Sequence, residues 1–143
     1  MPELNRAFCE LTKEECDVLL GHATQRVIAS GEVIIQQGET LNDLYVICHG
    51  NARVVQQSFD ETSVEFTGPL GPGDLFGEMS FMDGNQASAT LIADGDAEVL
   101  QFDRGTILDL LSAEPGMGMR FYQSILLTMC KRLRATNIRV NPA

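Results

Sequence analysis

The stretch FGEMSFMDGNQASAT, residues 76–90, combines the residue types that often hold an anion in proteins. Gly77 precedes Glu78 at the start of a short apolar segment, residues 78–82, which we expect to form one helical turn. The unpaired N–H groups and the dipole at a helix N-terminus attract an anion, and a glycine before them lets a ligand approach the backbone closely. Yet the stretch holds two carboxylates, Glu78 and Asp83, and no Lys, Arg or His. The stretch therefore favours an anion pocket that has no cation of its own. Because glycine-rich turns before a helical turn also occur in structural loops, the stretch does not identify a ligand.

Patterns typical of catalysis or metal binding are absent from the sequence. The two histidines, His22 and His49, form no His-x-His pair, and the four cysteines contain no CxxC. A metal-dependent enzyme in a β-barrel needs several His and carboxylate ligands that converge, and no nucleophile beside a base is visible. We therefore predict no metal, no catalytic residue and no enzymatic activity. Widely spaced cysteines also indicate a reducing cytoplasm.

The formal net charge of −10 is unevenly distributed. Residues 1–114 hold all 20 acidic residues and five of the ten basic ones, and residues 115–143 hold the other basic residues. An acidic body repels nucleic acid, whereas the basic tail is typical of a helix C-terminus, where the helix dipole favours cations. No apolar run approaches the ~20 residues needed to cross a bilayer, and residues 1–10 lack the profile of a secretory signal. We predict a cytoplasmic protein that binds neither nucleic acid nor membrane.

A mainly β arrangement with flanking helices must position these residues. Short segments rich in β-branched or aromatic residues lie between glycines: EVIIQQ, DLYVICHG, ARVVQQSF, SVEFTGPL, SATLIA and AEVLQFD. Many short strands at this spacing predict an antiparallel sandwich or jelly roll. A helix is expected from Thr12, because Thr12 and Glu15 form a capping box, and another over TILDLLSAEP, ended by Pro115. The chain length predicts one domain, residues 1–143.

A longer helix is expected over residues 116–137, and apolar side chains occupy more than one of its sides. One set falls at alternating steps of four and three, as in a coiled-coil seam: Tyr122, Leu126, Met129, Leu133, Thr136 and Val140. Phe121 and Ile125 lie beside that seam and are placed to pack on the sheet. We therefore predict a homodimer through this helix. The alternative is one broad apolar face that lies on its own domain.

The order of these features resembles the cyclic nucleotide-binding domain family, of the catabolite activator protein and protein kinase A regulatory subunit type. The resemblance covers nearly the whole chain with matching gaps, through SGEVIIQQGE, DLYVICHGNARV, GPGDLFGEMSFMDG, SATLIA and CKRLRATN. It implies an antiparallel jelly-roll β-barrel of eight strands, flanking helices and a long C-terminal helix. It also implies a phosphate-binding cassette between two of the strands.

The resemblance further implies a set of ligand-binding residues: Phe76, Gly77, Glu78, Met79, Ser80, Ala87, Ser88, Ala89, Thr136 and Asn137. The ligand would be a cyclic nucleotide, cAMP or cGMP, with no other cofactor. Glu78 would accept a hydrogen bond from the ribose 2′-hydroxyl. Gly77 and the backbone of Met79 and Ser80 would line the sugar and the cyclic phosphate.

Three further residues of this set have both an implied role and a simpler one. Ser88 would offer its N–H or hydroxyl to the ligand, or would only begin a strand. Thr136 and Asn137 would lie against the base, one of them from the partner chain of a dimer. Alternatively, Thr136 sets the register of the seam and Asn137 is a helix C-terminal residue. For Glu78 the alternative is stabilisation of a helix dipole without a ligand.

Position 87 departs from the family pattern. The resemblance places there an arginine that pairs with the cyclic phosphate, but the chain has Ala87. Each lost charge-assisted hydrogen bond is worth roughly 1.5–3 kcal/mol, which implies a loss of affinity of about 10- to 100-fold or more. Repulsion between the phosphate and Glu78 adds to this loss. Arg53, which the strand alternation points away from the interior, and Arg104, expected to begin a helix, do not replace the arginine.

Two functions remain open from the sequence. The first is a non-enzymatic regulatory module that binds a cyclic nucleotide weakly or in an altered pose. The second is a repurposed or binding-deficient relative that senses another ligand or acts by protein–protein interaction. An enzyme is the least favoured. Because no helix-turn-helix pattern precedes Ala143, we expect no DNA-binding domain and an output through an effector protein.

Overall fold

The structure is a computed structural model that describes residues 1–57 and 63–140, and for residues 63–68 and 136–140 it describes the backbone alone. The described elements are, in chain order, α1 (Pro2–Ala7), α2 (Lys13–Leu20), β1 (Thr24–Ile28), β2 (Val33–Ile35), β3 (Leu44–Gln57), β4 (Ser63–Leu70), β5 (Leu75–Phe76), α3 (Glu78–Asp83), β6 (Thr90–Phe102), α4 (Arg104–Ala113) and α5 (Pro115–Val140). The predicted helices correspond to α2, α4 and α5 within three residues, and the capping box of Thr12 and Glu15 is present. The short α1 was not predicted.

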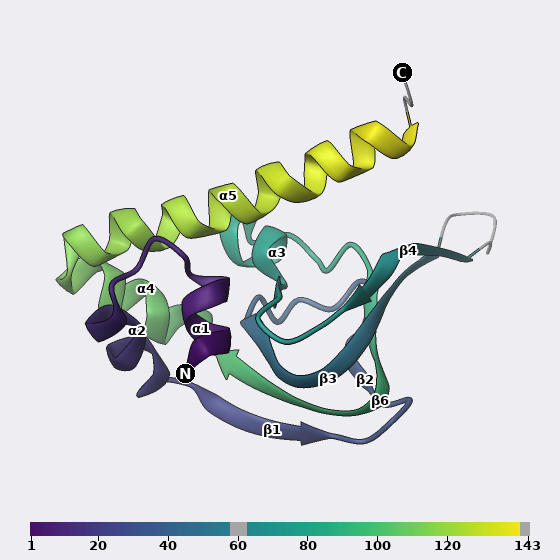
Figure 1. Cartoon of the computed structure of the whole chain (residues 1–143), viewed down its shortest axis with the longest axis horizontal. Helices are drawn as coiled ribbons and strands as arrows, with labels where there is room; N and C mark the ends of the chain where they lie inside the picture. Colours follow the sequence, from purple (N-terminus) through teal and green to yellow (C-terminus); the bar gives the residue numbers. More distant parts are fainter. Residues whose placement is uncertain (58–62, 141–143) are drawn as a thin grey trace.

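The described strands form one antiparallel sheet in the order β1-β6-β3-β4, with β2 also paired to β6 and β5 to β3. The predicted antiparallel, mainly β fold with flanking helices and a long C-terminal helix is confirmed, although the sheet is not closed into a barrel. Figure 1 shows the strands as one curved layer, with α1, α2 and α4 at one end and α5 lying across the top.

Two strands are longer than the glycine spacing predicted. β3 has 14 residues and joins DLYVICHG to ARVVQQSF, and β6 has 13 residues and joins SATLIA to AEVLQFD. Gly50 lies inside β3 with a φ of 81°, where the register with β6 shifts between His49 and Asn51. A β-bulge of this kind accommodates an extra residue in one strand and bends the strand without ending it. The segments that the sequence separates into short strands are therefore fewer, longer and bent.

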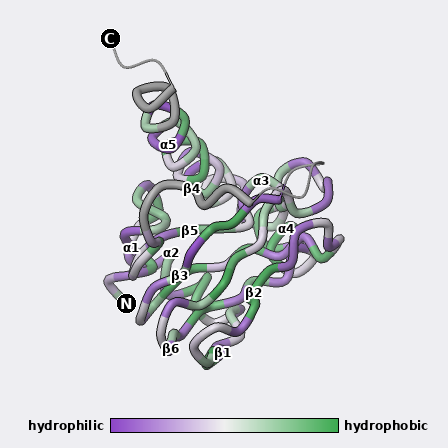
Figure 2. Tube along the Cα trace, turned by 90° about the vertical axis from the view of Figure 1, so that its right-hand side faces the viewer, coloured by the Kyte–Doolittle hydropathy of each residue, from purple (hydrophilic) through white to green (hydrophobic). Residues whose placement is uncertain are grey.

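The buried apolar residues form two clusters, and α5 belongs to the first of them. That cluster joins the helices to the strands β3 and β6 and contains Phe8, Phe81, Phe102 and Phe121. The second, around Tyr45 on β3, is formed by side chains of the strands β1, β2, β3, β5 and β6. Figure 2 shows hydrophobic stretches gathered along the middle strands, and α5 running out from the body toward the C-terminus.

Aromatic packing holds the N-terminal half of α5. Phe121 stacks on Phe8 with ring centroids 5.1 Å apart and lies 5.9 Å from the ring of Phe81. Its neighbour Ser124, also fully buried, accepts a hydrogen bond from the Glu10 N–H and donates one to the Arg120 carbonyl. The prediction that Phe121 and Ile125 pack inward is confirmed by their burial.

An ion pair connects α2 to the same part of α5. Arg120 contacts Glu15 with both Nε, at 2.8 Å from Oε1, and Nη2, at 2.6 Å from Oε2. This hydrogen-bonded pair, more than any other interaction of the carboxyl, lowers the pKa of Glu15 from 4.5 to about 2. The capping box therefore has a second role, because Glu15 at its third helical position also ties α2 to α5.

The other side of α5 is uncovered in this chain. Tyr122, Leu126 and Leu133 of the predicted seam are 37%, 61% and 62% exposed. Met129, assigned to the same seam, instead packs against the first cluster and is half-buried. Thr136 has no described side chain, and neither has Val140. Among the described residues, none of the helices contains an apolar stretch that could span a bilayer.

Candidate ligand-binding site

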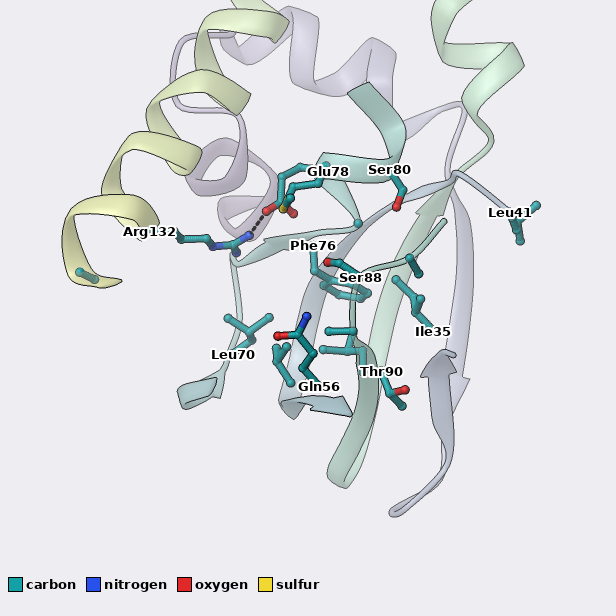
Figure 3. A pocket seen from close by; sticks show the side chains of 17 residues that line it. Ile35, Leu41, Gln56, Leu70, Phe76, Glu78, Ser80, Ser88, Thr90 and Arg132 are labelled. Carbon is teal, nitrogen blue, oxygen red and sulfur yellow. Dashed lines mark hydrogen bonds and ion pairs between the residues drawn. The ribbon is translucent and has the colours of Figure 1, made fainter. Parts of the chain in front are cut away.

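A cavity of about 350 Å³ lies between the curved sheet, the short helix α3 and the side of α5. Most of its wall is apolar and comes from Ile35, Leu41, Val54, Leu70, Phe76, Met79, Ala87, Ala89, Leu91 and Ala135. Its polar side chains are those of Gln56, Glu78, Ser80, Ser88, Thr90 and Arg132. Figure 3 shows Glu78 and Arg132 meeting at one side of this cavity, with Ser88 and Thr90 further along its wall.

Gly77 makes the sharp turn from β5 into α3. It has φ 79° and ψ 7°, a left-handed conformation that residues with a side chain rarely adopt. A Cβ atom here would lie 2.7 Å from the carbonyl oxygen of Asp43, the residue before β3, so the glycine also allows a close contact between the two backbone segments. The turn places Glu78 at the first position of α3, on the cavity side.

The Glu78 carboxylate is paired with an arginine from the far end of the chain. Arg132 Nη1 lies 2.6 Å from Glu78 Oε1, and Arg132 Nη2 donates to the Leu75 carbonyl oxygen. The Glu78 side chain is 10% exposed and that of Arg132 is 33% exposed. Burying a carboxylate without a partner is costly, and Arg132 offsets that cost while linking α5 to β5 and α3.

Comparison with known proteins gives the family of this arrangement. The family model described as "Cyclic nucleotide-binding domain" matches residues 25–114, well over half of the chain. The chain belongs to the cyclic nucleotide-binding domain family. The match runs from β1 to the end of α4 and includes the cassette, residues 76–90.

Relatives of this family agree with the match over most of the chain. The "Cyclic AMP receptor protein" of Thermus thermophilus is 29% identical over 136 residues, which is 94% of this chain and 60% of that protein. The crystal structure of the Thermus thermophilus catabolite activator protein has a TM-score of 0.81 at 29% identity, over 95% of this chain and 62% of that one. A cyclic nucleotide-binding domain from Methylobacillus flagellatus shares the fold with a TM-score of 0.91 at 20% identity, over 99% of this chain and 82% of that one. This chain therefore spans less than two thirds of the Thermus protein.

The structure brings the predicted cassette residues of this cyclic nucleotide-binding domain together. The eight that line the cavity are Phe76, Gly77, Glu78, Met79, Ser80, Ala87, Ser88 and Ala89. Their role toward a ligand remains a prediction. The side chains of the other two predicted residues, Thr136 and Asn137, lie outside the described residues.

Neither Arg53 nor Arg104 lines the cavity. Arg104 begins α4, as predicted, and its Nε donates to the Phe81 carbonyl oxygen at 2.7 Å. Arg53 lies on β3 and is half-buried. The described residues also include no group of three or more His, Cys, Asp or Glu that could hold a metal ion.

Sequence reasoning missed Arg132. The charge pattern predicts that the basic residues of the tail are cations near a helix end, but Arg132 reaches the cassette and pairs with Glu78. A signal for this was present, because Phe121, Ile125 and Met129 follow one another at steps of four and Arg132 comes three residues later. Such steps keep side chains on one face of a helix. An arginine that follows buried apolar residues on the same helix face is therefore a candidate to pair with a carboxylate inside the protein.

Proposed function

We propose that this chain is a non-enzymatic regulatory module that binds a small anionic ligand of the cyclic nucleotide type in the cavity beside α3. The observation that carries the proposal is the convergence of residues 76–80 and 87–89 on one cavity of about 350 Å³, with the Glu78 carboxylate on its wall. That volume lies within the range of small-molecule pockets, and the mixture of apolar walls with a few polar groups is typical of them. Family membership supports the same ligand class.

Binding of cAMP or cGMP is proposed to be weak or altered in pose. Ala87 stands where the resemblance places the phosphate-binding arginine, and its methyl group packs against the second apolar cluster. The alternative is a repurposed relative that senses another ligand or acts through a protein partner, which the largely apolar wall of the cavity favours. In either case we propose a cytoplasmic module that signals through an effector protein.

Restoring an arginine at position 87 is expected to tighten cyclic nucleotide binding. Calorimetric titration with cAMP and cGMP should give an affinity for Ala87→Arg at least about tenfold above that of the wild type, because charge-assisted hydrogen bonds are regained. Gln86→Arg is the matched control, since Gln86 is exposed and does not line the cavity. It adds the same charge one residue away.

The outcomes separate the two functions. A gain confined to Ala87→Arg supports a cyclic nucleotide pocket that lacks one cation. Micromolar or tighter binding by the wild type, with no gain in the variant, contradicts the idea that Ala87 is disabling. If neither protein binds either nucleotide, the proposal of a cyclic nucleotide ligand is wrong. The alternative, a relative that senses another ligand or acts through a protein partner, is then favoured.

A homodimer through α5 is part of the proposal. The seam residues Tyr122, Leu126 and Leu133 leave an apolar stripe uncovered along the helix, and a second copy of α5 would cover it with like side chains. Light scattering at micromolar concentration should give twice the chain mass of 15.7 kDa. Leu126→Glu should shift the mass to that of one chain. Glu114→Gln, an exposed change outside the seam, should not. A wild-type monomer would remove the dimer from the proposal.

A further inference from the structure

The wall of the cavity contains a half-buried amide, that of Gln56 on β3. Two nearby glutamines use their amides within the protein. Gln36 Nε2 donates to Thr90 Oγ1 at 3.2 Å, and the Gln37 amide forms two hydrogen bonds with the backbone of Gln57. Among the described residues, none forms a hydrogen bond with the Gln56 amide. Its N–H donors and its carbonyl acceptor are therefore available to a molecule in the cavity.

The backbone on both sides of Gln56 is held in place. Gln37 Nε2 donates to the Gln57 carbonyl oxygen at 2.9 Å, and the Gln57 N–H donates to Gln37 Oε1 at 2.8 Å. On the other side, Val55 pairs with Thr90, the first residue of β6, whose hydroxyl accepts from the Gln37 N–H at 2.9 Å. A side chain that starts from a fixed backbone loses less conformational freedom when it binds a ligand.

The strand geometry directs Gln56 toward the inside of the sheet. Successive side chains of a strand point to opposite faces, so Gln56 shares its face of β3 with Val54. Val54 packs against the second apolar cluster and also lines the cavity. Figure 3 shows the Gln56 amide pointing into the cavity between Leu70 and Ser88. The exposed Gln57 is not among the residues that line the cavity.

The surroundings of this amide fit a neutral part of a ligand. Figure 3 shows the pair of Glu78 and Arg132 at a different part of the wall. Close to Gln56 the wall is apolar, through Val54 and Leu70. An amide carries no charge and presents a donor beside an acceptor. It therefore suits a flat, mainly apolar group whose edge also carries a donor beside an acceptor, which describes a purine base.

We propose that Gln56 hydrogen-bonds to the base of the ligand and makes the pocket prefer adenine to guanine. This inference rests on the proposed function, since the base belongs to a cyclic nucleotide in the same cavity. In adenine the N6 amino donor lies between two ring acceptors, N1 and N7, so a glutamine amide can pair with either edge. In guanine the O6 acceptor lies between the N7 acceptor and the N1–H donor, so the amide can pair with one edge only.

The size of the preference follows from the burial of the amide. A ligand that covers Gln56 removes water from it, and a donor or acceptor left without a partner then costs affinity. A good bidentate contact between an amide and a base discriminates against the wrong base by about fivefold to 100-fold. Because Gln56 is only half-buried, the lower end of this range is expected.

The test compares Gln56→Leu with Gln57→Leu, the same replacement at the exposed neighbouring position. Calorimetric titration gives the ratio of the cGMP and cAMP dissociation constants for each protein. The wild type should bind cAMP about fivefold more tightly than cGMP. Gln56→Leu should reduce the ratio to less than about twofold, and Gln57→Leu should keep the wild-type ratio. The same series in the Ala87→Arg background measures the ratio where binding is tighter.

The ratio distinguishes a contact with the base from a merely structural role. A variant that only disturbs the wall weakens both nucleotides equally and leaves the ratio unchanged, and so does the loss of a contact with the phosphate or the ribose. A ratio that Gln56→Leu leaves unchanged or raises would therefore overturn the assignment, as would a wild type without a preference for cAMP. Circular dichroism should show that Gln56→Leu is folded, and Gln56→Met, which also removes the amide, replaces it if it is not.

A purine without the 6-amino group gives an independent check. The 3′,5′-cyclic monophosphate of purine riboside should bind the wild type about fivefold more weakly than cAMP, because the amide carbonyl of Gln56 loses its donor. Gln56→Leu should bind the two compounds about equally. The same difference between the two compounds in both proteins would contradict the contact.

Failure of this inference differs from failure of the proposed function. If the wild type or Ala87→Arg binds cyclic nucleotides and the ratio does not depend on Gln56, the inference is wrong while the nucleotide pocket stands. If neither protein binds cAMP or cGMP, the proposed function and the inference both fail.

Discussion

Replacing Phe121 with alanine is expected to lower the free energy of unfolding by about 3–5 kcal/mol, the usual cost of removing a buried phenyl ring. Phe121 is fully buried, stacks on Phe8 and contacts the ring of Phe81, so the ring joins α1, α3 and α5. The structure around it can collapse only partly, because these rings belong to three separate helices or their ends. We therefore expect α5 to pack less tightly against the rest of the protein. The hydrogen bond between Arg132 and Glu78 should weaken with it.

Urea denaturation at one fixed protein concentration measures this effect, since a dimer would make stability depend on concentration. Met119→Ala is the matched control on the same helix, because Met119 is 59% exposed. It should change stability by less than about 0.5 kcal/mol. A loss for Phe121→Ala as small as that of the control would contradict the packing described for α5.

Replacing Gly77 with alanine should have the largest effect of any single change in the cassette. The residue has φ 79°, and a new Cβ would meet the Asp43 carbonyl oxygen at 2.7 Å. A left-handed conformation costs an alanine about 1–2 kcal/mol, and a contact this short forces backbone atoms apart. We expect a total loss of about 2–4 kcal/mol in the free energy of unfolding. Because Glu78 follows directly, any measurable affinity for a cyclic nucleotide should fall more than about tenfold.

The glycine at the other end of α3 separates the two causes. Gly84 has φ 73°, nearly the conformation of Gly77, but a Cβ there would meet no atom within 4 Å. Gly84→Ala should therefore show the conformational cost alone, about 1–2 kcal/mol. Chemical unfolding of both variants gives the difference. If the two variants lose the same free energy of unfolding, the short contact with the Asp43 carbonyl oxygen does not destabilise Gly77→Ala.

Much of the cassette was predictable because its residues are close in the sequence. Residues 76–80 and 87–89 fold into one turn, one short helix and one strand entry, so their meeting at a cavity depends on local backbone preferences. The same applies to the capping box of Thr12 and Glu15, where both partners lie within one helical turn. Glycines were a weaker guide to strand ends, because Gly50 can sit in a bulge or in a turn, and the pairing of β3 with β6 decides which.

The family, the antiparallel sheet with its flanking helices, and the cassette with an alanine at position 87 all follow from patterns along the chain. The charge of the cavity depends instead on a contact between distant parts of the chain. Glu78 and Arg132 are 54 residues apart, and they meet because the face of α5 that carries Phe121 and Ile125 is the one buried against the body. Periodicity shows which side chains share a helix face, but burial of the aromatic residues on that face chooses what it lies against. Residues 76–90 thus contain no cation, but the fold brings Arg132 from α5 to the same cavity.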